Sequence, residues 1–205
     1  MFKDLFKNWN TIPNWLSFAR IIMIPIFAVL YYKDYYIAAL AVLAASGLSD
    51  MLDGKIARRF NQVSNLGKVL DPVADKLTQI TIAILLFIKF HASGNPALEA
   101  FSWIFLVFII KELLMVIVGA IMLSVNLRPS AAEIYGKVAT LVFYTVMIIL
   151  FAFAPGVGAF SSLWVLPDAL LMTLVVISAV LCVVALISYI PGTYRQFKEK
   201  YGSKK

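Results

Sequence analysis

Six stretches of mainly apolar residues divide this chain, and each is long enough to cross a membrane as a helix. A spanning helix needs about 20 apolar residues, and the bilayer requires every backbone N–H and C=O group to be paired inside the protein. Of the 205 residues, 62% are hydrophobic and 14% charged, a composition that excludes an ordinary soluble domain. We therefore predict an all-α, polytopic membrane protein with six transmembrane helices. These helices are expected at roughly residues 13–32, 37–57, 69–90, 101–124, 135–154 and 164–190.

The connections between these stretches are short and polar, which predicts a single membrane domain over residues 1–205. There is no internal repeat and no evident secretory signal. The apolar residues that precede the first stretch at helical spacing are Phe2, Leu5, Phe6 and Trp9. This pattern predicts a short helix over residues 1–11 that lies in the membrane interface, with a frayed terminus as the alternative. Residues 191–205 are basic, and we expect a solvated cytoplasmic tail there.

The distribution of lysine and arginine predicts the orientation in the membrane, since cytoplasmic loops are enriched in both. With both termini cytoplasmic, thirteen basic residues lie inside, and only Lys33 and Lys89 lie outside. The inside set is Lys3, Lys7, Lys55, Arg58, Arg59, Lys68, Arg128, Lys137, Arg195, Lys198, Lys200, Lys204 and Lys205. The net charge of +7 is therefore interpreted as orientation charge and attraction to anionic lipids, with no nucleic-acid partner.

Four aspartates fall within 26 residues: Asp50, Asp53, Asp71 and Asp75. Carboxylates at the edge of membrane helices are costly, so they are functional candidates with a partner to be named. On helices, the first two (i, i+3) share one face and the last two (i, i+4) share another. The combined oxygens suit Mg²⁺, Mn²⁺ or Ca²⁺ better than zinc. Hydrogen bonding to a neighbouring helix is the structural alternative, but it does not explain four carboxylates at these spacings.

The residues between the two aspartate pairs indicate phosphate chemistry. Gly54 removes a side chain beside the expected metal site, and Arg58 offers a guanidinium clamp for phosphate. Ser64 offers a hydroxyl, and Gly67 permits a tight entry into the next helix. Metal ions would neutralise phosphate oxygens, and one carboxylate would take a proton from an attacking hydroxyl. Phosphoryl-type transfer is therefore the predicted reaction class.

The run from Asp50 to Arg58 (DMLDGKIAR), followed by Gly67, Asp71 and Asp75, resembles the signature of the CDP-alcohol phosphatidyltransferase family at every defined position. The resemblance extends over the whole chain and includes Pro13-Asn14 at the start of the first stretch. It implies transfer of a phosphatidyl group from CDP-diacylglycerol to an alcohol, with release of CMP, in phospholipid biosynthesis. It also implies a homodimer whose active site opens to the cytoplasm.

The same resemblance implies roles for individual residues. Two divalent cations, Mg²⁺ or Mn²⁺, would be held by the aspartates at 50, 53, 71 and 75, and Asp75 would also be the catalytic general base. The residues implied to bind CDP-diacylglycerol are Asn14, Gly54, Arg58, Ser64 and Gly67.

The acceptor is predicted from the basic residues near the site. The candidates are Arg20, Lys68, Lys76, Lys111, Arg128 and Lys137. Lys111-Glu112 and Gly136-Lys137 resemble Arg-Glu and Gly-Lys pairs of phosphatidylglycerophosphate synthases in this family, although lysine at 111 lacks the bidentate fork of arginine. We therefore expect Lys111, Arg128 and Lys137 to bind sn-glycerol-3-phosphate, the acceptor that gives phosphatidylglycerophosphate. For Lys111 and Glu112, an ion pair that only fixes packing is the alternative.

Other functions stay open at this point. Within the family, the alternatives are a CMP-forming cardiolipin synthase, a phosphatidylinositol-phosphate synthase and an enzyme that uses serine. Outside the family, the aspartates could form the ion site of a cation-coupled transporter, which predicts ion flux and no CMP release. A structural scaffold leaves the carboxylates unexplained.

Overall fold

The computed structural model describes residues 10–59, 64, 66–125, 127 and 134–201, without the side chains of residues 51–58, 68 and 123. This part of the chain is all helical and contains no strand. The helices are α2 (Ile12–Tyr32), α3 (Tyr36–Arg59), α4 (Gly67–His91), α5 (Pro96–Ser102), α6 (Phe105–Ser124), α7 (Ile134–Phe153) and α8 (Asp168–Tyr201). The all-α prediction is therefore confirmed. The predicted interfacial helix over residues 1–11 falls mostly on residues outside this description.

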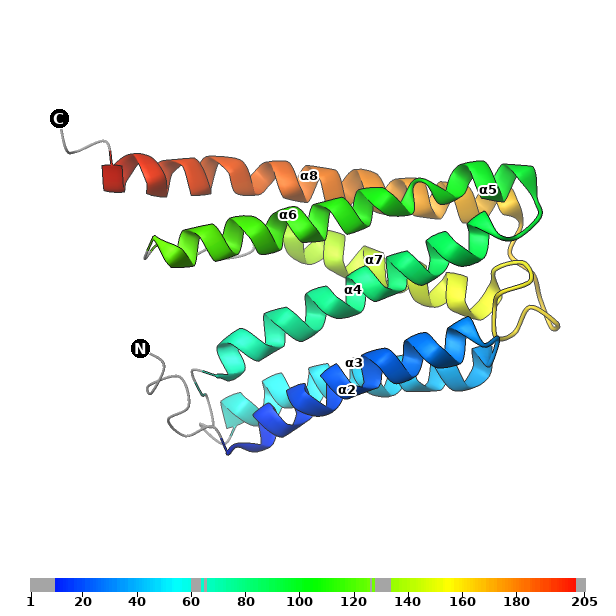
Figure 1. Ribbon diagram of the computed structural model, residues 1–205, viewed down its shortest axis with the longest axis horizontal. Coiled ribbons are helices and arrows are strands. Elements are labelled where there is room, and N and C mark those ends of the chain that lie inside the picture. The colour runs from blue at the N-terminus through cyan, green and yellow to red at the C-terminus, as the bar shows by residue number, and fades with distance from the viewer. Residues whose placement is uncertain (1–9, 60–63, 65, 126, 128–133, 202–205) are drawn as a thin grey trace.

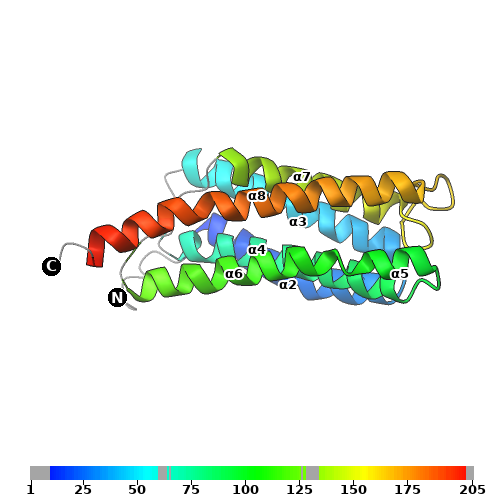
Figure 2. The same ribbon diagram turned by 90° about the horizontal axis from the view of Figure 1, so that it is seen from above.

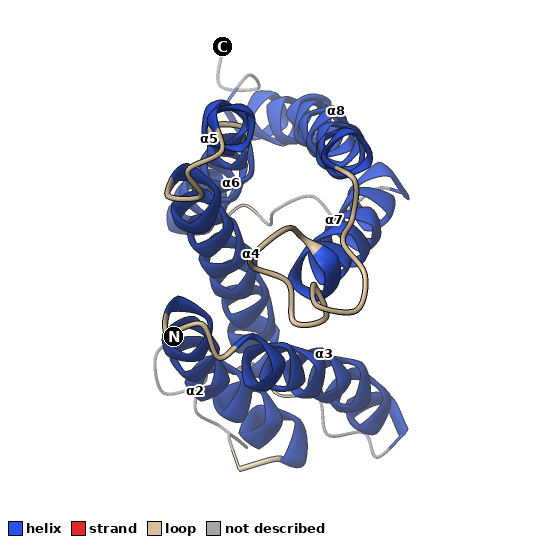
Figure 3. Ribbon diagram, turned by 90° about the vertical axis from the view of Figure 1, so that its right-hand side faces the viewer, coloured by secondary structure: helices blue, strands red, loops and turns tan. Residues whose placement is uncertain are grey.

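The long helices lie side by side in an elongated bundle (Figures 1 and 2). Helices α2 and α4 run in the same direction. Helix α3, which lies between them in the sequence, runs in the opposite direction. Seen from the end, α2 and α3 form one group beside α4, and α5, α6, α8 and α7 curve round the other side (Figure 3). The closest packing joins α2 to α3 and α4, α4 to α6, and α7 to α8. The start of α2, the end of α3 and the start of α4 consequently meet at one end of the bundle.

Four helical stretches among the described residues are long and apolar enough to cross a membrane: Ile12–Tyr32, Pro96–Met122, Ile134–Phe153 and Asp168–Tyr201. The other two predicted spans correspond to α3 and α4. The apolar part of α3 is limited to Tyr36–Asp50, which is shorter than a membrane span. Helix α4 has charged residues within its first three turns. The carboxylates that identify the candidate site therefore also weaken these two helices as membrane spans.

Two helices begin with side-chain caps. Thr11 precedes α2, and its hydroxyl accepts the backbone N–H of Asn14 at 3.4 Å. Asn95 caps α5 in the same way, with 3.0 Å between its side-chain oxygen and the backbone N of Ala97. Each cap is followed by a proline in the first turn, where a missing N–H costs little.

The end of the bundle opposite the aspartates is held by a lysine at the end of α4. Lys89 forms an ion pair with Asp34, which lies in the turn between α2 and α3. The ammonium group also lies 5.6–6.0 Å from the ring centres of Tyr31, Tyr32 and Tyr36. Hydrogen bonds from Lys89 and from Tyr36 hold the pKa of the Asp34 carboxyl below its usual range. These contacts fix the turn against α4.

Aromatic rings join α2 to α7 in the core. Phe151 meets Phe27 and Tyr31 edge-on, with ring centres 5.3 and 4.6 Å apart. The Tyr31 hydroxyl donates to the carbonyl oxygen of Val157 at 3.3 Å, so the buried ring also anchors the connection between α7 and α8.

Helix α8 is longer than the sixth apolar stretch and continues to Tyr201. Pro191 lies inside it, so the expected tail from residue 191 is helical as far as the description reaches. An exposed Arg195–Glu199 pair at 2.9 Å and a contact from Lys200 to the carbonyl of Val125 accompany this extension. The basic segment therefore contacts the backbone just after the end of α6.

Gly158 in the α7–α8 connection provides a test of the fold. A Cβ there would lie 2.7–2.8 Å from backbone atoms of Ala152, Phe153 and Ala154, which cannot rotate away. We expect Gly158→Ala to destabilise the protein by about 1–3 kcal/mol, the usual cost of overpacking. Thermal unfolding in detergent would measure this against Gly119→Ala, where a Cβ meets nothing within 4 Å. Equal melting temperatures for the two variants would contradict the packing described here.

Candidate active site

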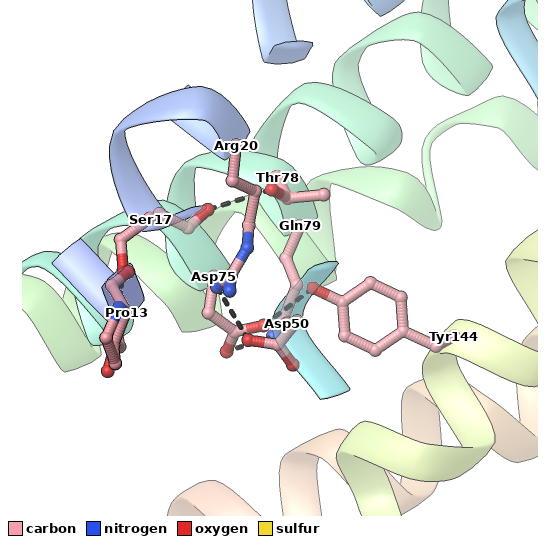
Figure 4. Close-up of polar contacts among 10 residues, drawn as sticks. Pro13, Ser17, Arg20, Asp50, Asp75, Thr78, Gln79 and Tyr144 are labelled. Carbon is pink, nitrogen blue, oxygen red and sulfur yellow. Dashed lines mark hydrogen bonds and ion pairs between the residues drawn. The ribbon is translucent and has the colours of Figure 1, made fainter. Parts of the chain in front are cut away.

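Three of the four aspartates have described side chains, and they come from two helices that meet at one end of the bundle. Asp50 lies near the end of α3, and Asp71 and Asp75 lie one turn apart on α4. They are close enough for the charges of Asp71 and Asp75 to act on Asp50. The backbone of Asp53 continues α3, but its side chain is outside the described part. Figure 4 shows Asp50 and Asp75 approaching each other from their two helices.

Helix α2 supplies two donors to these carboxylates. Arg20 is 3% exposed and forms an ion pair with Asp50, with 2.6 Å between Nη1 and Oδ1. The Ser17 hydroxyl lies 2.5 Å from Oδ1 of Asp71 and 3.0 Å from the carbonyl oxygen of Pro13. Ser17 and Arg20 are three residues apart and therefore share one face of the helix (Figure 4). This face of α2 stabilises negative charge on both α3 and α4.

Asp75 is held by donors on both of its oxygens. The Tyr144 hydroxyl from α7 donates to Oδ1 at 2.6 Å, and the Gln79 amide donates to Oδ2 at 2.9 Å (Figure 4). Gln79 is buried and lies one turn beyond Asp75 on α4. The carboxylate therefore has a fixed orientation, and each oxygen retains a lone pair for another ligand.

A second polar cluster joins the start of α2 to the start of α4. The Ser64 hydroxyl donates to Oδ1 of Asn14 at 2.8 Å and accepts the backbone N–H of Gly67 at 2.8 Å. Both side chains are buried. A Cβ at position 67 would lie 2.7 Å from Oδ1 of Asn14. Glycine is therefore required for this close approach, and three of the residues predicted to bind nucleotide lie together.

The other predicted ligands of CDP-diacylglycerol are Gly54 and Arg58. Both lie within the helical backbone of α3, and their side-chain positions are outside the description.

Two of the three predicted acceptor residues, Lys111 and Lys137, lie in the described part of the structure. Lys111 forms an ion pair with the adjacent Glu112, which is 2% exposed. Glu112 also accepts a hydrogen bond from Lys76 of α4, with 2.8 Å between Nζ and Oε2. Lys137 is exposed near the start of α7, and Arg128 lies outside the described residues. The ion pair of Lys111 and Glu112 is therefore present within α6, and the pair of Lys76 and Glu112 joins α4 to α6.

The aspartates have the ligand chemistry of a hard divalent metal, because all their donors are carboxylate oxygens. Within the described side chains, no three Asp, Glu, His or Cys residues form a group that could hold a metal ion. The fourth carboxylate, Asp53, is not among them. The carboxylate oxygens fit Mg²⁺ or Mn²⁺ by their chemistry. The aspartates of α3 and α4 are the residues that would bind the metal.

Sequence reasoning missed three residues of this site: Ser17, Gln79 and Tyr144. A signal existed for two of them. Asn14, Ser17 and Arg20 recur every three residues in an otherwise apolar helix, and Gln79 follows Asp75 by one turn. Tyr144 carries no comparable signal, because nothing local distinguishes it from the other aromatic residues of its helix.

Comparison with known proteins identifies the class to which this helical bundle and its aspartates belong. Residues 10–185 match the family described as CDP-alcohol phosphatidyltransferase. The match covers most of the chain and all four aspartates, so the chain belongs to the CDP-alcohol phosphatidyltransferase family, and the protein is an integral membrane protein.

Individual relatives differ in the reaction for which they are named. The CMP-forming cardiolipin synthase of Streptomyces coelicolor is 37% identical over 136 residues, which are 63% of this chain and 60% of that protein. The CDP-diacylglycerol–glycerol-3-phosphate 3-phosphatidyltransferase of Pseudomonas fluorescens is 44% identical over 87 residues, 41% of this chain and 43% of that protein. The chain thus spans less than two thirds of the length of both relatives.

The fold is similar to that of a solved structure. The phosphatidylinositol phosphate synthase of Mycobacterium tuberculosis, in complex with manganese and citrate, superposes with a TM-score of 0.64 at 17% identity. The match covers 89% of this chain and 82% of that one. It supports the same arrangement of helices.

The buried ion pairs around Glu112 provide a test of how α4 and α6 are joined. Glu112→Gln leaves two ammonium groups, Lys76 and Lys111, without their shared counter-charge. We expect a loss of about 3–5 kcal/mol, which lowers the melting temperature by roughly 6–20 °C. The control is Arg195→Gln, which removes an exposed pair and should change the melting temperature by less than about 2 °C. Unchanged stability of Glu112→Gln would show that the pairs do not hold the helices together.

Proposed function

We propose that this protein transfers the phosphatidyl group of CDP-diacylglycerol to an alcohol acceptor and releases CMP. The observation that carries the proposal is the set of carboxylates on α3 and α4, held by donors from α2 and α7 at one end of the bundle. In the reaction, the acceptor oxygen bonds to the phosphorus of the phosphatidyl group. The bond from that phosphorus to the CMP oxygen breaks, and the acceptor hydroxyl loses its proton.

Four residues, Asp50, Asp53, Asp71 and Asp75, would hold two divalent cations, Mg²⁺ or Mn²⁺. Bound metal would supply charge neutralisation for the diphosphate and for the departing CMP. The carboxylate chemistry of the site supports this assignment, and the mycobacterial structure of similar fold was determined with manganese. Arg20 and Ser17 hold two of these carboxylates in place before any ligand arrives.

Asp75 would act as the general base for the acceptor hydroxyl. A hydroxyl group has a very high pKa, so a base must lie within hydrogen-bond reach of it. Both oxygens of Asp75 are oriented by donors, so the carboxylate is held in a fixed position for this role.

The CDP-diacylglycerol headgroup would be bound by Asn14, Gly54, Arg58, Ser64 and Gly67. The support from geometry is the cluster of Asn14, Ser64 and Gly67, which lies at the same end of α4 as Asp71. Arg58 would neutralise a phosphate through its guanidinium group.

For the acceptor, we propose sn-glycerol-3-phosphate, with phosphatidylglycerophosphate as the product. Lys111, Arg128 and Lys137 are the candidate ligands of its phosphate. Lys111 with Lys76 and Glu112 carries one net positive charge beside α4, which favours an anionic acceptor. The alternative is phosphatidylglycerol, as in a CMP-forming cardiolipin synthase, because a relative of that name is also similar.

The proposed membrane arrangement completes the assignment. All of α2, α3, α4, α6, α7 and α8 would cross the bilayer within one domain over residues 1–205, and residues 1–11 would lie in the interface. Both termini and the aspartates would face the cytoplasm, which agrees with the excess of basic residues at that end. Two copies would form a homodimer.

Release of CMP by the purified protein tests the proposal. With CDP-diacylglycerol, Mg²⁺ or Mn²⁺ and one acceptor at a time, we expect release with sn-glycerol-3-phosphate and none in EDTA. Release only with phosphatidylglycerol, inositol phosphate or serine would keep the reaction and replace the acceptor. Ion flux through proteoliposomes without CMP release would instead favour a cation-coupled transporter.

Asp75→Asn separates the role of the proposed base from folding. Asparagine keeps an oxygen that can accept the Tyr144 hydroxyl, but it cannot take a proton. We expect CMP release to fall at least about 100-fold, the lower range for loss of a general base. The matched control is Asp34→Asn, at the opposite end of the bundle, which should stay within about twofold of wild type. Full activity of Asp75→Asn would rule out its role as base.

A further inference from the structure

We propose that Tyr144 is a positioning residue for Asp75: its hydroxyl, together with the Gln79 amide, holds the carboxylate in the orientation that accepts the proton of the acceptor alcohol. This inference rests on the proposed function, and it assigns a role to α7 in the chemistry. The two donors reach different oxygens of the same carboxylate.

The two contacts restrict different motions. Gln79 lies one turn beyond Asp75 on α4, so its amide moves with the same helix. Tyr144 is 69 residues away in the sequence and belongs to α7. A carboxylate held only from its own helix can still rotate about its side-chain bonds. A hydroxyl from α7, 2.6 Å from Oδ1, removes this freedom.

The Tyr144 ring is itself held in place. It meets Phe143 nearly edge-on, with ring centres 5.6 Å apart, and Phe143 is 1% exposed in the core. A hydroxyl on a fixed ring is a donor at a fixed point, and its hydrogen bond to an ionised acceptor is stronger than a neutral one. In Figure 4 the ring points from α7 straight at the Asp75 carboxylate.

The contact leaves the carboxylate usable. Each oxygen has about two lone pairs, and each accepts one described donor, so one lone pair per oxygen is still available. The free lone pairs then point in directions set by both α4 and α7. Since small misplacements of a reacting group can cost about 100-fold in rate, the fixed orientation affects turnover more than binding.

The test compares Tyr144→Phe with Tyr135→Phe, a tyrosine that is 60% exposed on the same helix. We expect Tyr144→Phe to lower kcat for CMP release about 10- to 100-fold, with KM for CDP-diacylglycerol within about threefold of wild type. Binding of Mn²⁺, measured by electron paramagnetic resonance without substrate, should stay within about twofold. Tyr135→Phe should resemble wild type in all three. Thermal unfolding of each variant checks that the fold is retained.

The outcomes separate the positioning role from its alternatives. An unchanged kcat in Tyr144→Phe, with an active wild type, would overturn the inference and leave the proposed function intact. Weaker Mn²⁺ binding in proportion to the loss of kcat would overturn it too, because the hydroxyl would then shape the metal site. Tighter Mn²⁺ binding would also overturn the inference, because the hydroxyl would then compete with the metal for the Asp75 carboxylate. An inactive wild type would overturn the proposed function and this inference together.

Discussion

The structure depends on stabilising carboxylates at one end of an otherwise apolar bundle. These carboxylates are only partly buried, and the Asp50 side chain is 58% exposed, so donors on neighbouring helices supplement the water around them. Arg20 of α2 forms an ion pair with Asp50, and Ser17 of α2 donates a hydrogen bond to Asp71. Tyr144 of α7 donates a hydrogen bond to Asp75. These donors require α2 to lie close to both α3 and α4, and α2 packs closely against both helices.

Much of this site could be predicted from the chain because its strongest signals are local. The aspartates lie within a short segment, and helical geometry alone assigns Asp71 and Asp75 to one face. Apolar stretches of membrane length predict the helices in the same direct way. The predicted stretch at 135–154 matches α7 to within one residue at each end. Local pattern is sufficient wherever one physical constraint, such as membrane thickness, dominates a segment.

The remaining features depend on contacts between distant segments. Nothing near Tyr144 in the sequence shows that its hydroxyl reaches α4, and nothing near Lys76 shows that it reaches Glu112 of α6. The continuation of α8 past Pro191 is likewise not evident from the sequence, because proline inside a helix removes a backbone hydrogen bond. The contact of Lys200 with the carbonyl oxygen of Val125, just after α6, accompanies this continuation. Such contacts are set by packing, which a single sequence does not display.

The bare backbone at Gly67 sets the axial register of two parallel helices. It lets Asn14 of α2 lie level with the first residue of α4. Ser17 is three residues further along α2, about 4.5 Å, and Asp71 is four residues further along α4, about 6 Å. The hydroxyl and the carboxylate therefore arrive at similar heights, where they meet. A side chain at position 67 would displace the Asn14 side chain, because its Cβ would lie 2.7 Å from Oδ1 of Asn14. The residues of the site would remain in the sequence, but the close packing of α2 against the start of α4 would be disturbed.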